Sequence, residues 1–177
     1  MTLAPRRRHS PLLALAMMVW RQESEGTMAT YTADIDWKLA DGDDFANGRY
    51  SRGHTLTFDG GTVIPASASP HVVGKWAVKE AVDPEEMLVA ALSNCHMLSF
   101  LHVAGLAGFI VAAYRDHAEG VMEEIAPDKH ALTKVVLHPR IEWVGGAPDR
   151  VKLDHLHHEA HEVCFIANSV KTNVTVA

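Results

Sequence analysis

Alternating apolar and polar positions predict β-strands near both ends of the chain. From residue 31 to residue 39, apolar side chains at every second position alternate with threonine, aspartate and lysine, which is the period of a half-buried strand. Residues 49–58 and 62–66 predict a second and a third strand, and Gly60-Gly61 between them is typical of a hairpin turn. The alternation returns at 170–176 and predicts a closing strand.

Two other segments have the spacing and the end signals of helices. Asp83-Pro84-Glu85-Glu86 is typical of a helix start, with an N-capping aspartate, a proline in the first turn and acidic side chains at the positive end of the dipole. The residues that follow are apolar nearly all round, which indicates a buried helix that ends near Gly105 or Gly108. Pro148-Asp149 opens a second helix with its own apolar stripe.

The segment between the helices completes the predicted order. Residues 109–122 and 130–144 predict two strands joined near Pro127, and residues 67–83 form a long connection. The resulting order, βββ-α-ββ-α-β, predicts an α+β fold.

Composition narrows the classes of protein that fit this pattern. With 177 residues, 47% hydrophobic, the chain suits one compact domain and excludes wholesale disorder. A net charge of −6 disfavours a nucleic-acid binder, which needs a basic face. Two cysteines cannot build a disulfide scaffold. The apolar stretches are interrupted before the ~18–20 residues that span a bilayer, so no membrane partner is expected.

The first 27 residues differ from the rest. Three arginines precede an apolar stretch from Leu12 to Trp20, as in a signal peptide, but no small-residue cleavage site follows. A regular strand pattern begins directly after Met28. We therefore treat 1–27 as an N-terminal extension, arising from a mis-assigned start, a flexible tail or an export signal, and 28–177 as a single domain.

The two cysteines are the first candidates for chemistry. Cys95 lies in the middle of the first long helix and Cys164 at the end of the second. Free cysteines are often buried packing residues. Here both have polar and histidine neighbours, including His96 and His161, which can favour a reactive thiolate. One thiol on each helix is the minimum for a redox couple in which one attacks and the other resolves.

A metal site is a competing interpretation. His157, His161 and Cys164 share one helical face, and with Cys95 they would give four soft ligands, although no HExxH or CxxC signature is present. The sequence also lacks G-x-S-x-G, G-x-G-x-x-G and P-loop motifs, so neither a serine nucleophile nor a nucleotide cofactor is expected.

Two motifs carry a resemblance to a known family. The segments DPEEMLVAALSNCHM and HEVCFIANSVKTNVTV, whose cysteines are 69 residues apart, resemble the OsmC/Ohr family of thiol-dependent hydroperoxide reductases. The resemblance covers roughly residues 30–177. Phe165 follows the second cysteine where family members often have proline.

The resemblance implies a function and a set of site residues. Cys95 would attack an organic hydroperoxide and become a sulfenic acid, and Cys164 would condense with it to a disulfide. Arg52, with Arg49 as the alternative, and Glu85 would assist. A dithiol or a lipoylated protein would act as reductant, without cofactor or metal. The fold implied is an intertwined homodimer, with antiparallel sheets around a buried cysteine-bearing helix, in the cytoplasm. The rival hypotheses are an OsmC-fold protein that binds a small ligand without peroxidase activity, and the metal module.

Helix geometry raises a question about Glu85 and Cys95. Ten residues along a straight helix separate two side chains by about 15 Å and turn them ~80° apart. Either the helix kinks between these positions, or Glu85 and Arg52 reach the cysteine of a partner chain. The all-round apolar helix also needs more cover than one small sheet supplies, which favours a homodimer.

Overall fold

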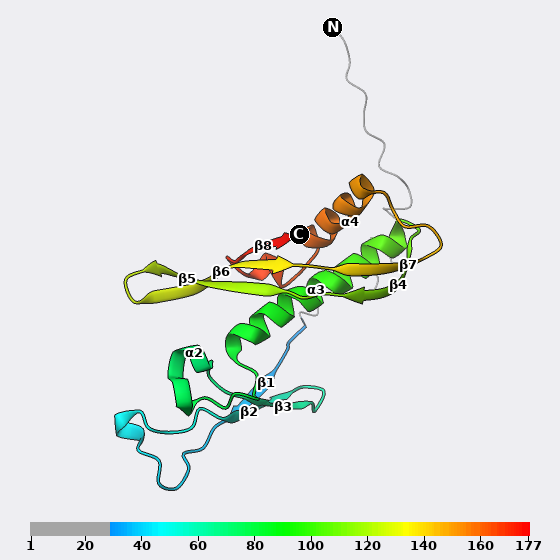
Figure 1. The fold of residues 1–177 in the computed structure, drawn as a ribbon. Helices are drawn as coiled ribbons and strands as arrows, with labels where there is room; N and C mark the ends of the chain where they lie inside the picture. Colours follow the sequence, from blue (N-terminus) through cyan, green and yellow to red (C-terminus); the bar gives the residue numbers. More distant parts are fainter. Residues whose placement is uncertain (1–28) are drawn as a thin grey trace.

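The computed structural model describes residues 29–177 (Figure 1). The prediction for residues 1–27 lies outside this range. Within these residues the chain forms three small sheets and two long helices, so the α+β prediction is confirmed.

The N-terminal sheet is an antiparallel meander of β1 (Ala33–Asp36), β2 (His54–Phe58) and β3 (Val63–Ala66). Its hairpin turns at Gly61, whose φ of 80° lies in the left-handed region that glycine adopts without strain. The three predicted strands and the turn are therefore present. The first two strands are shorter than predicted, and β1 is exposed along its whole length rather than half-buried. Figure 1 shows this sheet at the N-terminal end of the long helix, apart from the other strands.

The connection after β3 contains two short helical turns, α2 (Pro70–Val73) and a 3₁₀ turn (Gly74–Trp76). Two contacts hold it to β3. The Ser67 hydroxyl accepts the Val78 N–H at 2.9 Å, and Ala66 forms a parallel bridge with Val82.

The long helix α3 (Pro84–Leu106) begins where the sequence predicts. Its start is a capping box: Glu86 N–H donates to the Asp83 carboxylate at 2.8 Å, and Asp83 N–H donates to the Glu86 carboxylate at 3.0 Å. It ends before Gly108, which has a φ of 85°.

Burial of α3 departs from the prediction. Only one face is buried in the chain, and Leu98 and Leu106 are 56% and 59% exposed on the other. The expectation of a fully buried helix is therefore wrong for a single chain. The expectation that no apolar segment reaches membrane-spanning length is also wrong, since α3 is long and apolar enough by composition. Core helices of soluble proteins pass the same test, and one such helix is weak evidence for a membrane span.

Between the two long helices the structure has four strands where the sequence predicted two. They are β4 (Ile110–Arg115), β5 (Glu119–Ala126), β6 (Lys129–Leu137) and β7 (Arg140–Val144), in which β4 pairs with β7 and β5 with β6. Pro139 has no N–H for a ladder and separates β6 from β7. Asp116 interrupts the other side, where its carboxylate accepts the His138 N–H at 2.6 Å.

The chain ends with α4 (Arg150–Glu162) and β8 (Asn173–Val176), which confirms the second helix and the closing strand. β8 lies parallel to β6, with Val135 opposite Val174. Two core clusters result: one centres on Phe100 and Leu156 between α3 and α4, and the other joins Leu92 of α3 to the sheet of β5, β6 and β8.

Candidate active site

The structure brings the two cysteines together. Cys95 lies midway along α3, and Cys164 follows the end of α4, which packs against α3. The two thiols are neighbours, since Cys95 is among the groups that shift the pKa of Cys164. The turn after Cys164 adds two backbone donors: Ile166 N–H points to the Cys95 sulfur and Ala167 N–H to the Cys164 sulfur, each at 3.5 Å. Both cysteines are free thiols.

The two thiols differ in environment. Cys164 is only 1% exposed, whereas Cys95 is half-buried. Burial raises the pKa of Cys164 to about 11, and the neighbouring Cys95 acts in the same direction. Cys164 therefore stays protonated at neutral pH. The Ile166 N–H points to the Cys95 sulfur and the protonated Cys164 thiol lies beside it, an arrangement suited to negative charge on Cys95.

Arg52 lies before β2, and its guanidinium is held locally. It lies 3.4 Å above the Tyr50 ring, and Nη1 donates to the Tyr50 carbonyl at 2.7 Å. Within residues 29–177, the structure records no hydrogen bond or ion pair from Arg52 to Glu85 or to either cysteine. The alternative, Arg49, pairs its main chain with Asp44 in an antiparallel bridge.

Glu85 lies in the first turn of α3 and lines an open groove of about 1010 Å³ between α3, the α2 segment and β5. Its Oε2 atom is buried and has no hydrogen-bond partner in the described part of the chain. A buried carboxylate oxygen without a partner costs free energy. The helix continues unbroken from Pro84 to Leu106, so the chain shows no kink that would bring Glu85 to Cys95.

One histidine of the metal hypothesis, His157, contacts another histidine, His96. His157 Nδ1 lies 3.1 Å from Nε2 of His96, and the two rings are stacked. Burial, and then the neighbouring His157, lower the pKa of His96 to about 4, so its ring is neutral at pH 7. The described residues contain no group of three or more histidine, cysteine or acidic side chains placed to hold a metal ion.

Sequence reasoning missed the backbone donors of the site. Ile166 and Ala167 act through their N–H groups, which have no side-chain signature. The available signal was the turn that follows Cys164, which the structure forms as a 3₁₀ helix (Ala167–Ser169). A second missed element is Asp116, which accepts hydrogen bonds from Ser93 of α3 and from His138 N–H, and so ties α3 to the strands.

Comparison with known proteins defines the family. The model of the OsmC-like proteins matches residues 77–177, so this chain belongs to the OsmC family. An OsmC-like protein of unknown function from Vibrio cholerae is 47% identical, with 85% of this chain and 99% of that chain covered and a TM-score of 0.81. No protein in the curated collection is similar enough to match.

More distant structures share the fold. An organic hydroperoxide resistance protein from Elizabethkingia anophelis is 19% identical, covers 86% of this chain and 98% of its own, and has a TM-score of 0.64. The organic hydroperoxide resistance protein OhrB of Bacillus subtilis is 18% identical, with 84% and 95% covered and a TM-score of 0.55.

Proposed function

We propose that the protein is a thiol-dependent peroxidase that reduces organic hydroperoxides in defence against oxidative stress. The observation that carries this proposal is the proximity of Cys95 and Cys164, two thiols 69 residues apart in the sequence that lie at the same turn after α4. Such a pair is suited to forming a disulfide after one sulfur is oxidised. The names of the hydroperoxide resistance proteins with this fold point in the same direction.

The proposed cycle assigns a different role to each thiol. The Cys95 thiolate attacks one peroxide oxygen, a sulfur–oxygen bond forms, and the oxygen–oxygen bond breaks. The alkoxide that leaves takes up a proton and departs as an alcohol. Cys95 is now a sulfenic acid, which the Cys164 sulfur attacks; the hydroxide leaves with the Cys164 proton as water, and a disulfide remains. A dithiol or lipoylated-protein reductant is oxidised to its own disulfide as it restores both thiols.

Arg52 and Glu85 are proposed to act from a partner chain in a homodimer. Three features support this. Glu85 has a buried oxygen without a partner, the guanidinium of Arg52 lies with the N-terminal sheet, and α3 leaves a row of apolar side chains exposed. An arginine can present its donors to both a carboxylate and a peroxide oxygen. A solution mass of a monomer at all concentrations would exclude the dimer.

The remaining assignments follow from the same proposal. We propose the cytoplasm as the compartment, because the cycle needs both cysteines to return to thiols. We propose residues 28–177 as the functional domain, and no metal or other cofactor takes part in the cycle.

The decisive experiment measures consumption of cumene hydroperoxide with a dithiol reductant. We expect turnover by the wild type and none by Cys95→Ser. Cys164→Ser should accumulate the Cys95 sulfenic acid, trapped by dimedone, and lose turnover with this reductant. Full activity of Cys95→Ser would refute the proposal. Stoichiometric zinc in the purified protein would favour the metal module instead.

A further inference from the structure

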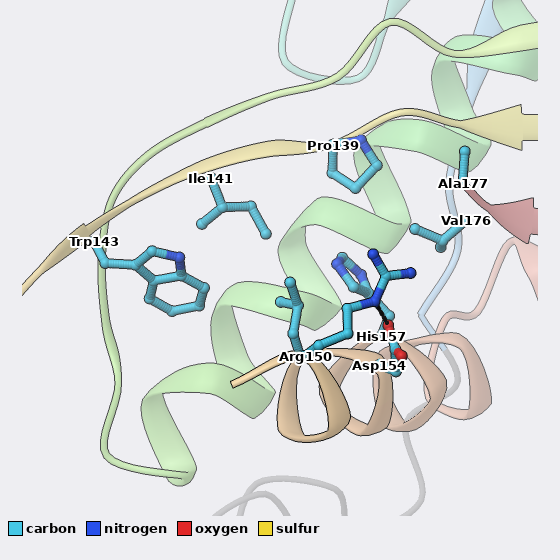
Figure 2. A pocket seen from close by; sticks show the side chains of 9 residues that line it. Pro139, Ile141, Trp143, Arg150, Asp154, His157, Val176 and Ala177 are labelled. Atoms are coloured by element: carbon cyan, nitrogen blue, oxygen red, sulfur yellow. Dashed lines mark ion pairs between the residues drawn. The ribbon is translucent and has the colours of Figure 1, made fainter. Parts of the chain in front are cut away.

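A second cavity, of about 460 Å³, lies away from the two cysteines, between α4 and the strands β7 and β8 (Figure 2). Its volume falls in the range of about 300–1,000 Å³ that is typical of small-molecule sites. None of the four proposed site residues lines it. Its walls are largely apolar and come from three elements: Ile141 and Trp143 of β7, Leu153 of α4 and Val176 of β8.

One face of α4 supplies the polar groups of this cavity. Arg150, Asp154 and His157 follow one another at a spacing of four and three residues, so they lie on the same face of the helix. Arg150 and Asp154 form an ion pair, with Nε 2.8 Å from Oδ1. The contact uses Nε, which leaves the two terminal nitrogens of the guanidinium as donors. Figure 2 shows these nitrogens directed across the cavity toward Val176.

His157 forms part of the same cavity and is fixed in place. The side chain is buried, its ring stacks on Phe100 with centroids 4.4 Å apart, and Nδ1 is taken by His96. Burial lowers the pKa of His157, so its ring is neutral at neutral pH. The cavity therefore combines the Arg150 guanidinium, the Asp154 carboxylate paired with it and the neutral ring of His157.

We propose that this cavity binds a small monocarboxylate with a flat apolar tail. The carboxylate would accept hydrogen bonds from the two terminal nitrogens of Arg150, which match the two oxygens of a carboxyl group. The Arg150 guanidinium would repel a cationic ligand, and the Asp154 carboxylate would repel the second charge of a dianion. The tail would lie against Trp143 and Leu153.

The test uses 3-phenylpropanoate as the probe and its neutral counterpart, 3-phenylpropan-1-ol, each titrated calorimetrically into the full chain without peroxide. We expect saturable binding of one carboxylate per chain, at least about tenfold tighter than the alcohol. Arg150→Gln should weaken binding of the carboxylate at least about tenfold and leave the affinity for the alcohol unchanged. Arg150→Lys, which keeps the charge but loses the fork, should be intermediate.

A matched control and a second variant separate binding from folding. Arg115→Gln removes another exposed arginine that pairs with an acid, Glu142, but does not line the cavity, and it should bind both probes like the wild type. Trp143→Ala should weaken both probes. Equal affinity for acid and alcohol, an unchanged Arg150→Gln, or no binding by a folded wild type would overturn the proposal. Because the assay contains no peroxide, these outcomes are independent of the proposed peroxidase activity.

Discussion

The N-terminal sheet and the rest of the domain are built on different principles. The part from α3 to β8 buries two core clusters and brings its two cysteines together within a single chain. The sheet of β1, β2 and β3 buries only Leu56 and Ala66 among its apolar side chains, and Ile35 and Val63 are 64% and 56% exposed. Its strands pack mainly on one another.

This difference indicates where a single chain is incomplete. A small three-stranded sheet with one buried leucine has little apolar area to stabilise it alone. The same sheet precedes the segment of α2, and the loop before β2 holds Arg52, the proposed partner of Cys95. The N-terminal part of the chain therefore combines a sheet that is poorly covered with Arg52, the cation that Cys95 lacks within its own chain. A partner chain that covers the sheet would explain both observations.

The largest expected effect tests whether Arg52 of one chain and Cys95 of its partner form one active site. Arg52→Ala and Cys95→Ser should each lose at least about 100-fold of the peroxidase activity, since the first removes the cation and the second the nucleophile. When the two inactive variants are co-expressed, heterodimers contain one site in which both residues are intact. We expect these heterodimers to regain up to half of the activity of the wild-type dimer, measured with cumene hydroperoxide.

Arg49→Ala is the matched control for that experiment and should keep the activity of the wild type. If the two variants remain inactive after subunit exchange, verified by mass spectrometry, Arg52 does not act from a partner chain.

The second prediction concerns the buried histidine pair of the larger region, His96 and His157. His96 is 1% exposed and its pKa is lowered from 6.5 to about 4. Between these values the unfolded chain binds a proton that the folded chain does not. Stability is therefore highest above pH 6.5 and falls as the pH is lowered toward 4, by about 3 kcal/mol at most. His157 acts in the same direction, since its pKa is also lowered.

Urea unfolding at a series of pH values measures this effect. His96→Gln should flatten the slope between pH 6.5 and 4, whereas His130→Gln, an exposed histidine of β6, should keep it. An identical slope in wild type and His96→Gln would contradict the prediction.

The third prediction sharpens the contrast between the two thiols. Because the pKa of Cys164 is raised from 9.0 to about 11, its thiolate fraction at pH 8 is about 100-fold below that of an unperturbed thiol. Iodoacetamide should therefore modify Cys95 well before Cys164 in the reduced protein, as followed by peptide mass spectrometry. The Cys95→Ser variant shows whether Cys164 remains slow in the absence of its neighbour; faster labelling of Cys164 in the wild type would exclude its role as the protonated partner.

Local signals in the sequence predicted most of the fold. The N-capping Asp83, the Gly60-Gly61 turn and the period of the outer strands act over a few residues, and the elements that they predict are present. The split of the middle strands depends on Pro139 and on the contacts of Asp116, which bind residues distant in sequence. Such contacts have no periodic pattern, so they were not predicted.

The candidate site divides in the same way. The pair of Cys95 and Cys164 was predicted through two motifs, and the structure joins them. The donor from Ile166 and the local stacking of Arg52 on Tyr50 depend on three-dimensional placement, which a motif does not encode. The partly exposed α3 differs from prediction for a further reason: an all-round apolar sequence indicates that the helix is covered, but not by which chain.

The smallest expected effect asks directly whether the N-terminal sheet is covered in solution. Ile35 is 64% exposed in the single chain, where truncation to alanine would change stability by no more than about 0.5 kcal/mol. If a partner chain covers it, Ile35→Ala should instead cost about 1–2 kcal/mol, or roughly 2–8 °C in the melting temperature. The reason is that the shorter side chain buries less apolar area against the partner. The loss should also shrink as the protein is diluted until the dimers dissociate, since Ile35 is then uncovered in wild type and variant alike. Val151→Ala, at a side chain 79% exposed on α4, is the control and should stay within about 0.5 kcal/mol. Equal, concentration-independent melting of both variants would mean that the sheet faces water as it does in the single chain.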